Sequence, residues 1–207
     1  MSRSSSRQQI GNAVIRAIEK SFEVHYAMSE DWLDYAPEYF VSVRIAEELA
    51  KKAHKSYVTM EYPVRDCIND ADIAIRGRPH RELRRNGRFD VVLWWRSTER
   101  PRAAIEVKHP VWSDPSLLDA DAKRLCRVLA DGKGLQFAML AYYCSSEKPR
   151  RKHTSATARI KARAQRIERR IRSIAKGLHC RAEFHRGNIR RFDGEAWTAR
   201  CVRFDKY

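Results

Sequence analysis

The stretch "AAIEVKHP", residues 103–110, places a carboxylate and an ammonium in a segment whose other residues predict a buried strand. Side chains alternate between the two faces of a strand, so Glu106 and Lys108 project to one face and Val107 to the other. Burying a carboxylate without a partner is costly, because the group loses the hydration that stabilises its charge. The pattern therefore predicts a partner for Glu106, which is a cation, a water-filled cleft or a salt bridge.

The preceding segment, "GRFDVVLWW" at residues 87–95, is a short apolar run that predicts a strand buried on both faces. The turn "STERPR", residues 97–102, joins the two segments, which most simply form an antiparallel hairpin. Asp90 lies 16 residues before Glu106, where the apolar run begins. The hairpin is therefore expected to bring Asp90, Glu106 and Lys108 together.

The segments around this hairpin alternate between helix and strand patterns. Upstream, the sequence predicts a short N-terminal helix, a helix that starts at Pro37, a strand over residues 56–64 and a polar loop over 65–86. The two helices have apolar stripes at Ile10, Val14 and Ile18, and at Val41, Ile45 and Leu49. Downstream, residues 113–134 predict a helix and residues 135–144 a third buried strand. That helix has Ser113 or Asp114 as its cap, Pro115 in its first turn, and Gly132 or Gly134 at its end.

The C-terminal part of the chain is strongly basic. Residues 148–176 hold 12 Lys or Arg and one acid, Glu168, on a pattern that predicts an amphipathic helix. Its apolar stripe is Ile160, Ala164, Ile167, Ile171, Ile174 and Leu178. Two antiparallel strands should follow, with a turn at Asp193 and Gly194. The expected fold is α/β, a single domain over residues 1–207 with a core at 37–145 and an appendage at 148–207.

Charge and composition narrow the partners. With 42 Lys and Arg against 26 Asp and Glu, the net charge is +16. This excess favours nucleic acid as the partner. The alternative is that the excess of positive charge only keeps the protein soluble. Five scattered cysteines without C-x-x-C spacing predict neither disulfides nor a zinc site. The sequence has no apolar leader and no run of about 18 apolar residues, so we expect a cytoplasmic protein without a membrane partner.

The three charged residues of the hairpin suggest metal chemistry. Two neighbouring carboxylates repel each other, and a hard divalent cation relieves that repulsion through oxygen ligands. The expected cofactor is Mg²⁺, with Mn²⁺ as a substitute, bound by Asp90, Glu106 and the carbonyl of Val107. Lys108 would stabilise the negative charge that develops on a phosphate.

The sequence around Asp90, followed by Glu106-Val107-Lys108, resembles the active-site signature of the PD-(D/E)xK nuclease superfamily, which has the restriction-endonuclease-like fold. The resemblance covers residues 37–145 and extends to the order of helix, three strands, helix and strand. Phe89 stands where the signature has proline. The superfamily often adds an acid from its first helix, and Glu38 is the expected counterpart, with Glu48 as the rival.

The resemblance also implies functional residues on the helix after the lysine strand, and the charge pattern of the basic helix suggests others. Asp121 and Arg124 are expected to face the site or the phosphate backbone from the helix that follows the lysine strand. On the basic helix, Arg163, Arg166 and Arg170 are expected to contact phosphates. We expect His109 to be structural and Glu61 to face solvent.

The expected activity is metal-dependent hydrolysis of phosphodiester bonds in DNA, by analogy in restriction, repair or defence against foreign DNA. RNA remains an alternative substrate, and a homodimer is expected because cutting both strands of a duplex commonly needs two sites. Two other functions stay open. One is a nucleic-acid-binding protein that keeps the nuclease fold without cleavage, and the other is an assembly protein whose basic helix holds an acidic partner.

Overall fold

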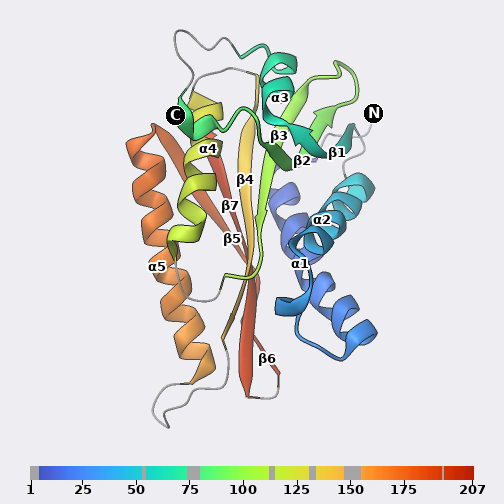
Figure 1. Ribbon diagram of the computed structural model, residues 1–207, viewed down its shortest axis with the longest axis vertical. Helices are drawn as coiled ribbons and strands as arrows, with labels where there is room; N and C mark the ends of the chain where they lie inside the picture. The colour runs from blue at the N-terminus through green and yellow to red at the C-terminus, as the bar shows by residue number, and fades with distance from the viewer. Residues whose placement is uncertain are drawn as a thin grey trace.

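Seven strands form one mixed sheet in the order β1-β2-β3-β4-β7-β5, with β6 paired to β7. Helices cover both faces, α1 and α2 on one side and α4 and α5 on the other (Figure 1). The computed structural model describes residues 5–52, 55–73, 80–111, 115–130, 134–146, 155–192 and 194–207. The α/β fold expected from the sequence is confirmed in this form. Among the described residues, no helix is long and apolar enough to cross a membrane.

Two helices from the first quarter of the chain cover one face of the sheet. They are α1 (Arg7–Ser29) and α2 (Glu38–Lys52), joined by the short 3-10 helix η1 (Leu33–Tyr35). Ser6 starts α1 with a capping box, in which its hydroxyl accepts from the Gln9 backbone N–H. The first helix is expected to be short but spans 23 residues. Both predicted apolar stripes are buried in one cluster with the sheet.

The predicted hairpin is confirmed. Strands β1 (Ser56–Pro63), β2 (Arg88–Trp95) and β3 (Pro101–Lys108) pair antiparallel in sequence order. The polar segment 65–86, predicted as a loop, is partly helical instead. It contains most of α3 (Val64–Asp70) and the 3-10 helix η2 (Arg81–Leu83).

The chain then crosses one face of the sheet and returns parallel to β3. The crossing consists of the 3-10 helix η3 (Pro115–Leu118) and α4 (Asp119–Ala130), and the returning strand is β4 (Phe137–Ser146). Every residue of β4 is buried, as its continuous apolar sequence predicts. The predicted cap residues Ser113 and Asp114, and the predicted helix end at Gly132, lie outside the described residues.

The C-terminal segment belongs to the sheet and is not an appendage to it. After α5 (Ala156–Gly177), the chain forms β5 (Cys180–Arg186), β6 (Arg190–Phe192) and β7 (Glu195–Lys206). Strand β7 lies between β4 and β5, antiparallel to both, and its residues 196–205 are buried. Strands β5, β6 and β7 therefore complete the sheet that β1 to β4 begin, and a separate core at 37–145 stays a prediction.

The basic helix packs as its sequence predicts. On α5, the side chains of Ile160, Ala164, Ile167 and Ile171 are buried, while Ile174 and Leu178 are partly buried against the same core. The basic side chains lie on the opposite face, where Arg166, Arg169 and Arg172 are exposed. Glu168 is the only acid among its residues.

Candidate active site

Asp90 is fixed to the middle of the Glu-Val-Lys segment where β2 and β3 separate. The backbone pairing of the two strands runs as far as Val91 opposite Ile105. Beyond that pair, the Val107 N–H donates to Oδ2 of Asp90 at 2.6 Å, so a carboxylate replaces the backbone carbonyl as acceptor. Asp90 therefore lies beside this segment, as the sequence predicts.

The acid from α2 is Glu38. Its carboxylate accepts from Nζ of Lys108 at 3.1 Å and from the backbone N–H of His109 at 2.9 Å. Both contacts lie at the end of β3, so the first turn of α2 is held against the site.

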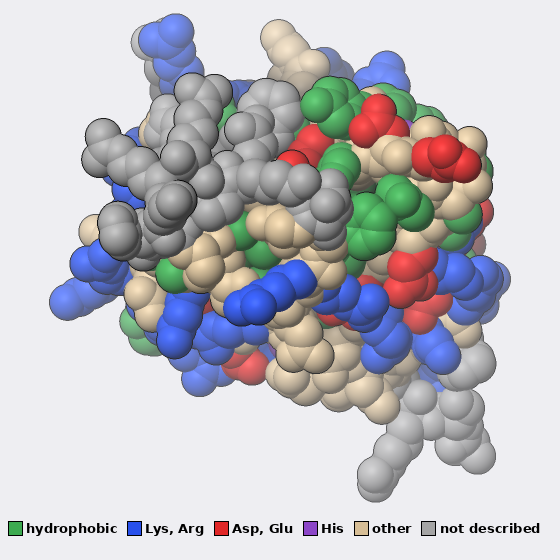
Figure 2. All heavy atoms as spheres, turned by 90° about the horizontal axis from the view of Figure 1, so that it is seen from below, with side chains coloured by type: hydrophobic (Ala, Val, Ile, Leu, Met, Phe, Trp, Pro, Cys, Tyr) green, Lys and Arg blue, Asp and Glu red, His purple; other side chains and the backbone are tan. Residues whose placement is uncertain are grey.

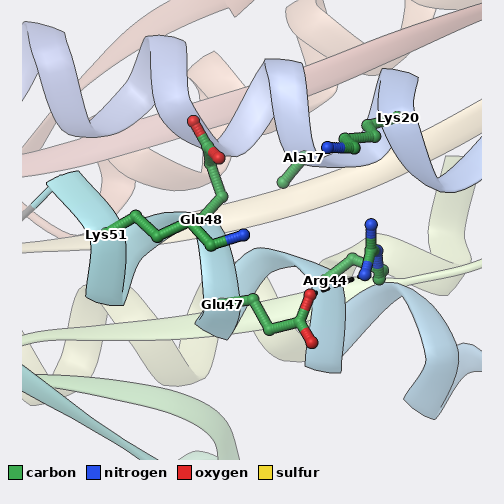
Figure 3. A pocket seen from close by; sticks show the side chains of 6 residues that line it. All are labelled: Ala17, Lys20, Arg44, Glu47, Glu48 and Lys51. Carbon is green, nitrogen blue, oxygen red and sulfur yellow. Dashed lines mark hydrogen bonds and ion pairs between the residues drawn. The ribbon is translucent and has the colours of Figure 1, made fainter.

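The rival acid, Glu48, points elsewhere. It is ten residues further along α2, which is about 15 Å of helix, and its carboxylate lies 3.6 Å from the guanidinium of Arg16. Glu48 lines a small charged pocket between α1 and α2 together with Lys20 and Lys51 (Figure 3). Of the two candidates, only Glu38 reaches Lys108.

Helix α4 contributes a third acid and an arginine. Asp121 is buried, with Oδ2 at 3.7 Å from Nζ of Lys108 and Oδ1 at 3.5 Å from the guanidinium of Arg84. One turn later, the buried guanidinium of Arg124 forms an ion pair with Glu106 and lies 5.4 Å from the centre of the Phe89 ring. The partner that Glu106 requires is therefore an arginine from α4, while Lys108 pairs with Glu38 and Asp121.

Burial makes the carboxyl groups of Asp90 and Glu106 reluctant to ionise. Burial raises the pKa of Asp90 to about 6. The hydrogen bond from the Val107 N–H opposes this rise, and the negative charge of Glu38 adds to it. Burial also raises the pKa of Glu106 well above its ordinary value, although Arg124 opposes the rise. For Lys108, burial lowers the pKa, but the Glu38 and Asp121 carboxylates outweigh it and the pKa is raised. Lys108 is therefore a firmly charged ammonium, whereas the surroundings of Asp90 and Glu106 disfavour their negative charges.

The donor set suits a hard cation, although the acids are not arranged as a ready-made cluster. Carboxylate oxygens and a backbone carbonyl are the ligands that Mg²⁺ prefers. The negative charge of Asp90 also adds to the raised pKa of Glu106. Within the part of the chain that the structure describes, no group of three or more His, Cys, Asp or Glu side chains is placed to hold a metal ion as it stands. A cation between Asp90 and Glu106 would compete with Arg124 for Glu106.

The arginines expected to contact phosphates differ in accessibility. Arg124 is buried in its ion pair with Glu106. Arg163 is half-buried and donates to the backbone carbonyl of Ser145. Arg166 is exposed, and Arg170 is exposed while its Nε donates to Asp119 at 2.6 Å. Phosphate binding by these residues stays a prediction, and the two exposed side chains on α5 are the better placed for it.

Three further residues complete the description of the site. The ring of His109 is buried, with Nε2 at 2.6 Å from the Leu33 carbonyl, which fits the structural role predicted for it. Glu61 is half-buried in β1, and its negative charge adds to the raised pKa of Asp90. Arg84 was not expected at the site, because it lies in the polar segment whose sequence gave no clear period.

No protein-family model, curated protein or solved structure matches this chain. The arrangement of its own residues therefore carries the functional argument.

Proposed function

We propose that this chain is a metal-dependent nuclease of the PD-(D/E)xK type that hydrolyses phosphodiester bonds in DNA. The observation that carries the proposal is the meeting of Asp90, Glu38 and Asp121 around the Glu106-Val107-Lys108 segment. These groups come from two strands and two helices. A surface salt bridge needs neither four carboxylates nor the burial of two of them, Glu106 and Asp121.

The chain's own residues supply charge stabilisation and positioning. Hydrolysis forms a bond between a water oxygen and phosphorus and breaks one phosphorus–oxygen ester bond, while negative charge gathers on the non-bridging oxygens. The Lys108 ammonium, held between Glu38 and Asp121, is the cation that would stabilise that charge. Glu38 also accepts from the backbone N–H of His109, so one carboxylate holds both the side chain of Lys108 and the backbone next to it.

The proposed cofactor is Mg²⁺, or Mn²⁺ in its place. Asp90, Glu106 and the carbonyl of Val107 would hold it, and when bound it would polarise the phosphate and lower the pKa of water.

A basic surface near the site supports DNA as the substrate. The net charge of +16 favours binding to polyanions. Arg170 links α5 to Asp119, two residues before Asp121, so the basic helix borders the site. Seen from below, Lys and Arg side chains are spread over the lower part of the face, beside a region where hydrophobic and acidic side chains lie together (Figure 2).

One observation favours a second candidate, a nucleic-acid-binding protein that keeps the fold without cleavage. Glu106 is buried against Arg124, and an arginine already supplies the positive charge that a metal ion would supply. Under this alternative the chain binds DNA equally well with and without a divalent cation.

Cleavage assays separate the two candidates. The full-length protein would be incubated with supercoiled plasmid and with single-stranded circular DNA, in Mg²⁺ and in EDTA. We expect cleavage in Mg²⁺ only, and a loss of about a hundredfold or more in Asp90→Ala and Lys108→Ala, because each removes a group that contacts the proposed reacting centre.

A matched pair on α2 controls for changes in the helix. Glu38→Gln should reduce cleavage, while Glu48→Gln should leave it unchanged, since the second acid does not reach Lys108. Cleavage that persists in both Asp90→Ala and Lys108→Ala would overturn the assignment of this site. Binding without cleavage, unaffected by EDTA, would favour the second candidate.

A further inference from the structure

Exposed aromatic side chains lie in the segment that leads into the proposed site. Among the described residues, Tyr35 is 72% exposed and Tyr39 is 56% exposed, and both are close in sequence to Glu38. Tyr35 ends η1, and Tyr39 follows Glu38 in the first turn of α2. An exposed aromatic ring gains nothing from burial, so two such rings within three residues of Glu38 in the chain suggest a partner with a flat apolar face.

The backbone that carries these rings is fixed to the ends of the central strands. The ring of His109, after β3, bonds to the Leu33 carbonyl at 2.6 Å. The hydroxyl of Ser145, in β4, donates to Asp34 at 2.7 Å. Glu38 accepts from the His109 backbone N–H. The two tyrosines therefore project from a rigid support, and little order is lost when a ligand packs on them.

Charges are ordered along the site, starting from this aromatic segment. Lys108 Nζ lies between Glu38 at 3.1 Å and Asp121 at 3.7 Å, and the other oxygen of Asp121 contacts Arg84, whose side chain is half-exposed. Exposed tyrosines thus neighbour Glu38 in the chain, at one end of this series of contacts, and the exposed guanidinium of Arg84 lies at the other end. A nucleic acid strand offers the matching pair, flat bases and a charged backbone.

We propose that Tyr35 and Tyr39 stack on unpaired bases, so that the substrate is single-stranded DNA or a duplex end with unpaired nucleotides. Bases inside a duplex are already stacked on both faces and cannot pack on these rings without being flipped out. This inference rests on the proposed function, because it names the substrate class of the same site.

Binding in EDTA tests the inference independently of cleavage. The probes are two fluorescein-labelled strands of the same length and charge, an oligothymidylate and an abasic oligonucleotide, and a blunt duplex, measured by fluorescence anisotropy. We expect the wild type to bind the oligothymidylate more tightly than the abasic strand. Tyr35→Ala with Tyr39→Ala should lose roughly tenfold per tyrosine for oligothymidylate and almost nothing for the abasic strand or duplex.

Two control variants make the result specific. Tyr35→Phe with Tyr39→Phe keeps the rings and should bind as the wild type does. Tyr207→Ala removes a tyrosine that is 79% exposed and follows the end of β7. This end of β7 lies away from the site, because Phe204 pairs with Ala138 near the start of β4. Lys108 pairs with Tyr142, further along β4. Tyr207→Ala should have no effect on binding.

Each outcome separates the inference from the proposed function. If the double alanine variant binds oligothymidylate as tightly as the wild type, the tyrosines serve another partner, such as a protein, and the inference is overturned even if Mg²⁺-dependent cleavage is observed. An equal loss in Tyr207→Ala would also overturn it. If the tyrosine-dependent preference for bases is found without any cleavage, the inference holds and the nuclease proposal fails.

Discussion

At the scale of single residues, the half-buried carboxylate of Asp90 should cost stability at neutral pH. Its pKa is raised from 3.8 to about 6 in the folded chain, so the unfolded chain ionises first as pH increases. The folded state therefore loses stability between about pH 4 and pH 6, and the cost is complete above that range. A difference of about 2 pKa units corresponds to at most about 3 kcal/mol.

Replacing Asp90 with Asn should remove this cost, while its side-chain oxygen still accepts from the Val107 N–H. We expect the free energy of unfolding of Asp90→Asn to exceed that of the wild type by about 1–3 kcal/mol at pH 8, and to show no gain at pH 4. Urea unfolding at the two pH values measures both. A gain of equal size at pH 4 would show that ionisation is not the cause.

The ion pair between Arg124 and Glu106 is the second prediction at this scale. Both side chains are buried, so removing one partner leaves the other charge without compensation. Arg124→Met should lower the free energy of unfolding by about 3–5 kcal/mol, and Arg124→Met with Glu106→Leu should lower it by less than the sum of the single changes.

Chemical denaturation of the two single variants and the double variant gives the coupling energy. Lys123→Met, at the adjacent and less buried position on α4, should change stability by no more than about 0.5 kcal/mol. Additive effects of Arg124 and Glu106 would mean that the two side chains do not stabilise each other.

At the scale of elements, the periodicity of apolar residues was sufficient to predict a helix or strand that buries a continuous stripe. The spacing of Val41, Ile45 and Leu49 predicted α2, and the unbroken apolar run of residues 135–144 predicted β4. Helix α3 was missed because only Val64, Cys67 and Ile68 of its seven residues are buried, which is too short a pattern to show a period.

The contact between α1 and β5 depends on a glycine. A Cβ built on Gly11 would lie 2.4 Å from the ring of His185, which is buried. Gly11→Ala should therefore destabilise the chain by about 1–3 kcal/mol, although alanine favours a helix by up to about 1 kcal/mol more than glycine.

Thermal and urea unfolding would measure this effect. Gly177→Ala is the matched control, because nothing lies within 4 Å of the corresponding Cβ at the end of α5. Combining Gly11→Ala with His185→Ala should recover part of the loss, because the shorter side chain leaves room for the added methyl group. If Gly11→Ala is as stable as the wild type, α1 can shift away from β5 without cost.

At the scale of the whole molecule, the sequence predicted which charged residues come together around β2 and β3 better than it predicted the strand order. Asp90, Glu106 and Lys108 are linked by a short hairpin, and alternation along a strand then decides which side chains meet. The position of β7 depends on pairing with β4, about 60 residues earlier, and no local pattern specifies such a partner. The charged residues Arg200, Arg203 and Asp205 are uncommon in the centre of a sheet, yet all three are buried in β7.

The central position of β7 leads to the last prediction. Strand β7 pairs with β4 along nine residue pairs, from Ala138–Phe204 to Ser146–Ala196, and Trp197 stacks on Phe22 of α1 with ring centres 4.5 Å apart. A chain that ends at residue 178 would lack β5, β6 and β7, and would leave the fully buried β4 as an open edge.

That truncated chain should not fold. It would lose buried surface on both faces of the sheet, and the stabilising free energy lost with that surface exceeds the small net stability of a domain. Far-UV circular dichroism and the cooperativity of thermal unfolding would test this, with a chain that ends at Lys206 as the control, since it removes only the exposed Tyr207. If the chain ending at residue 178 unfolds cooperatively, residues 37–145 form an independent core after all, and the C-terminal strands only extend a sheet that is already stable.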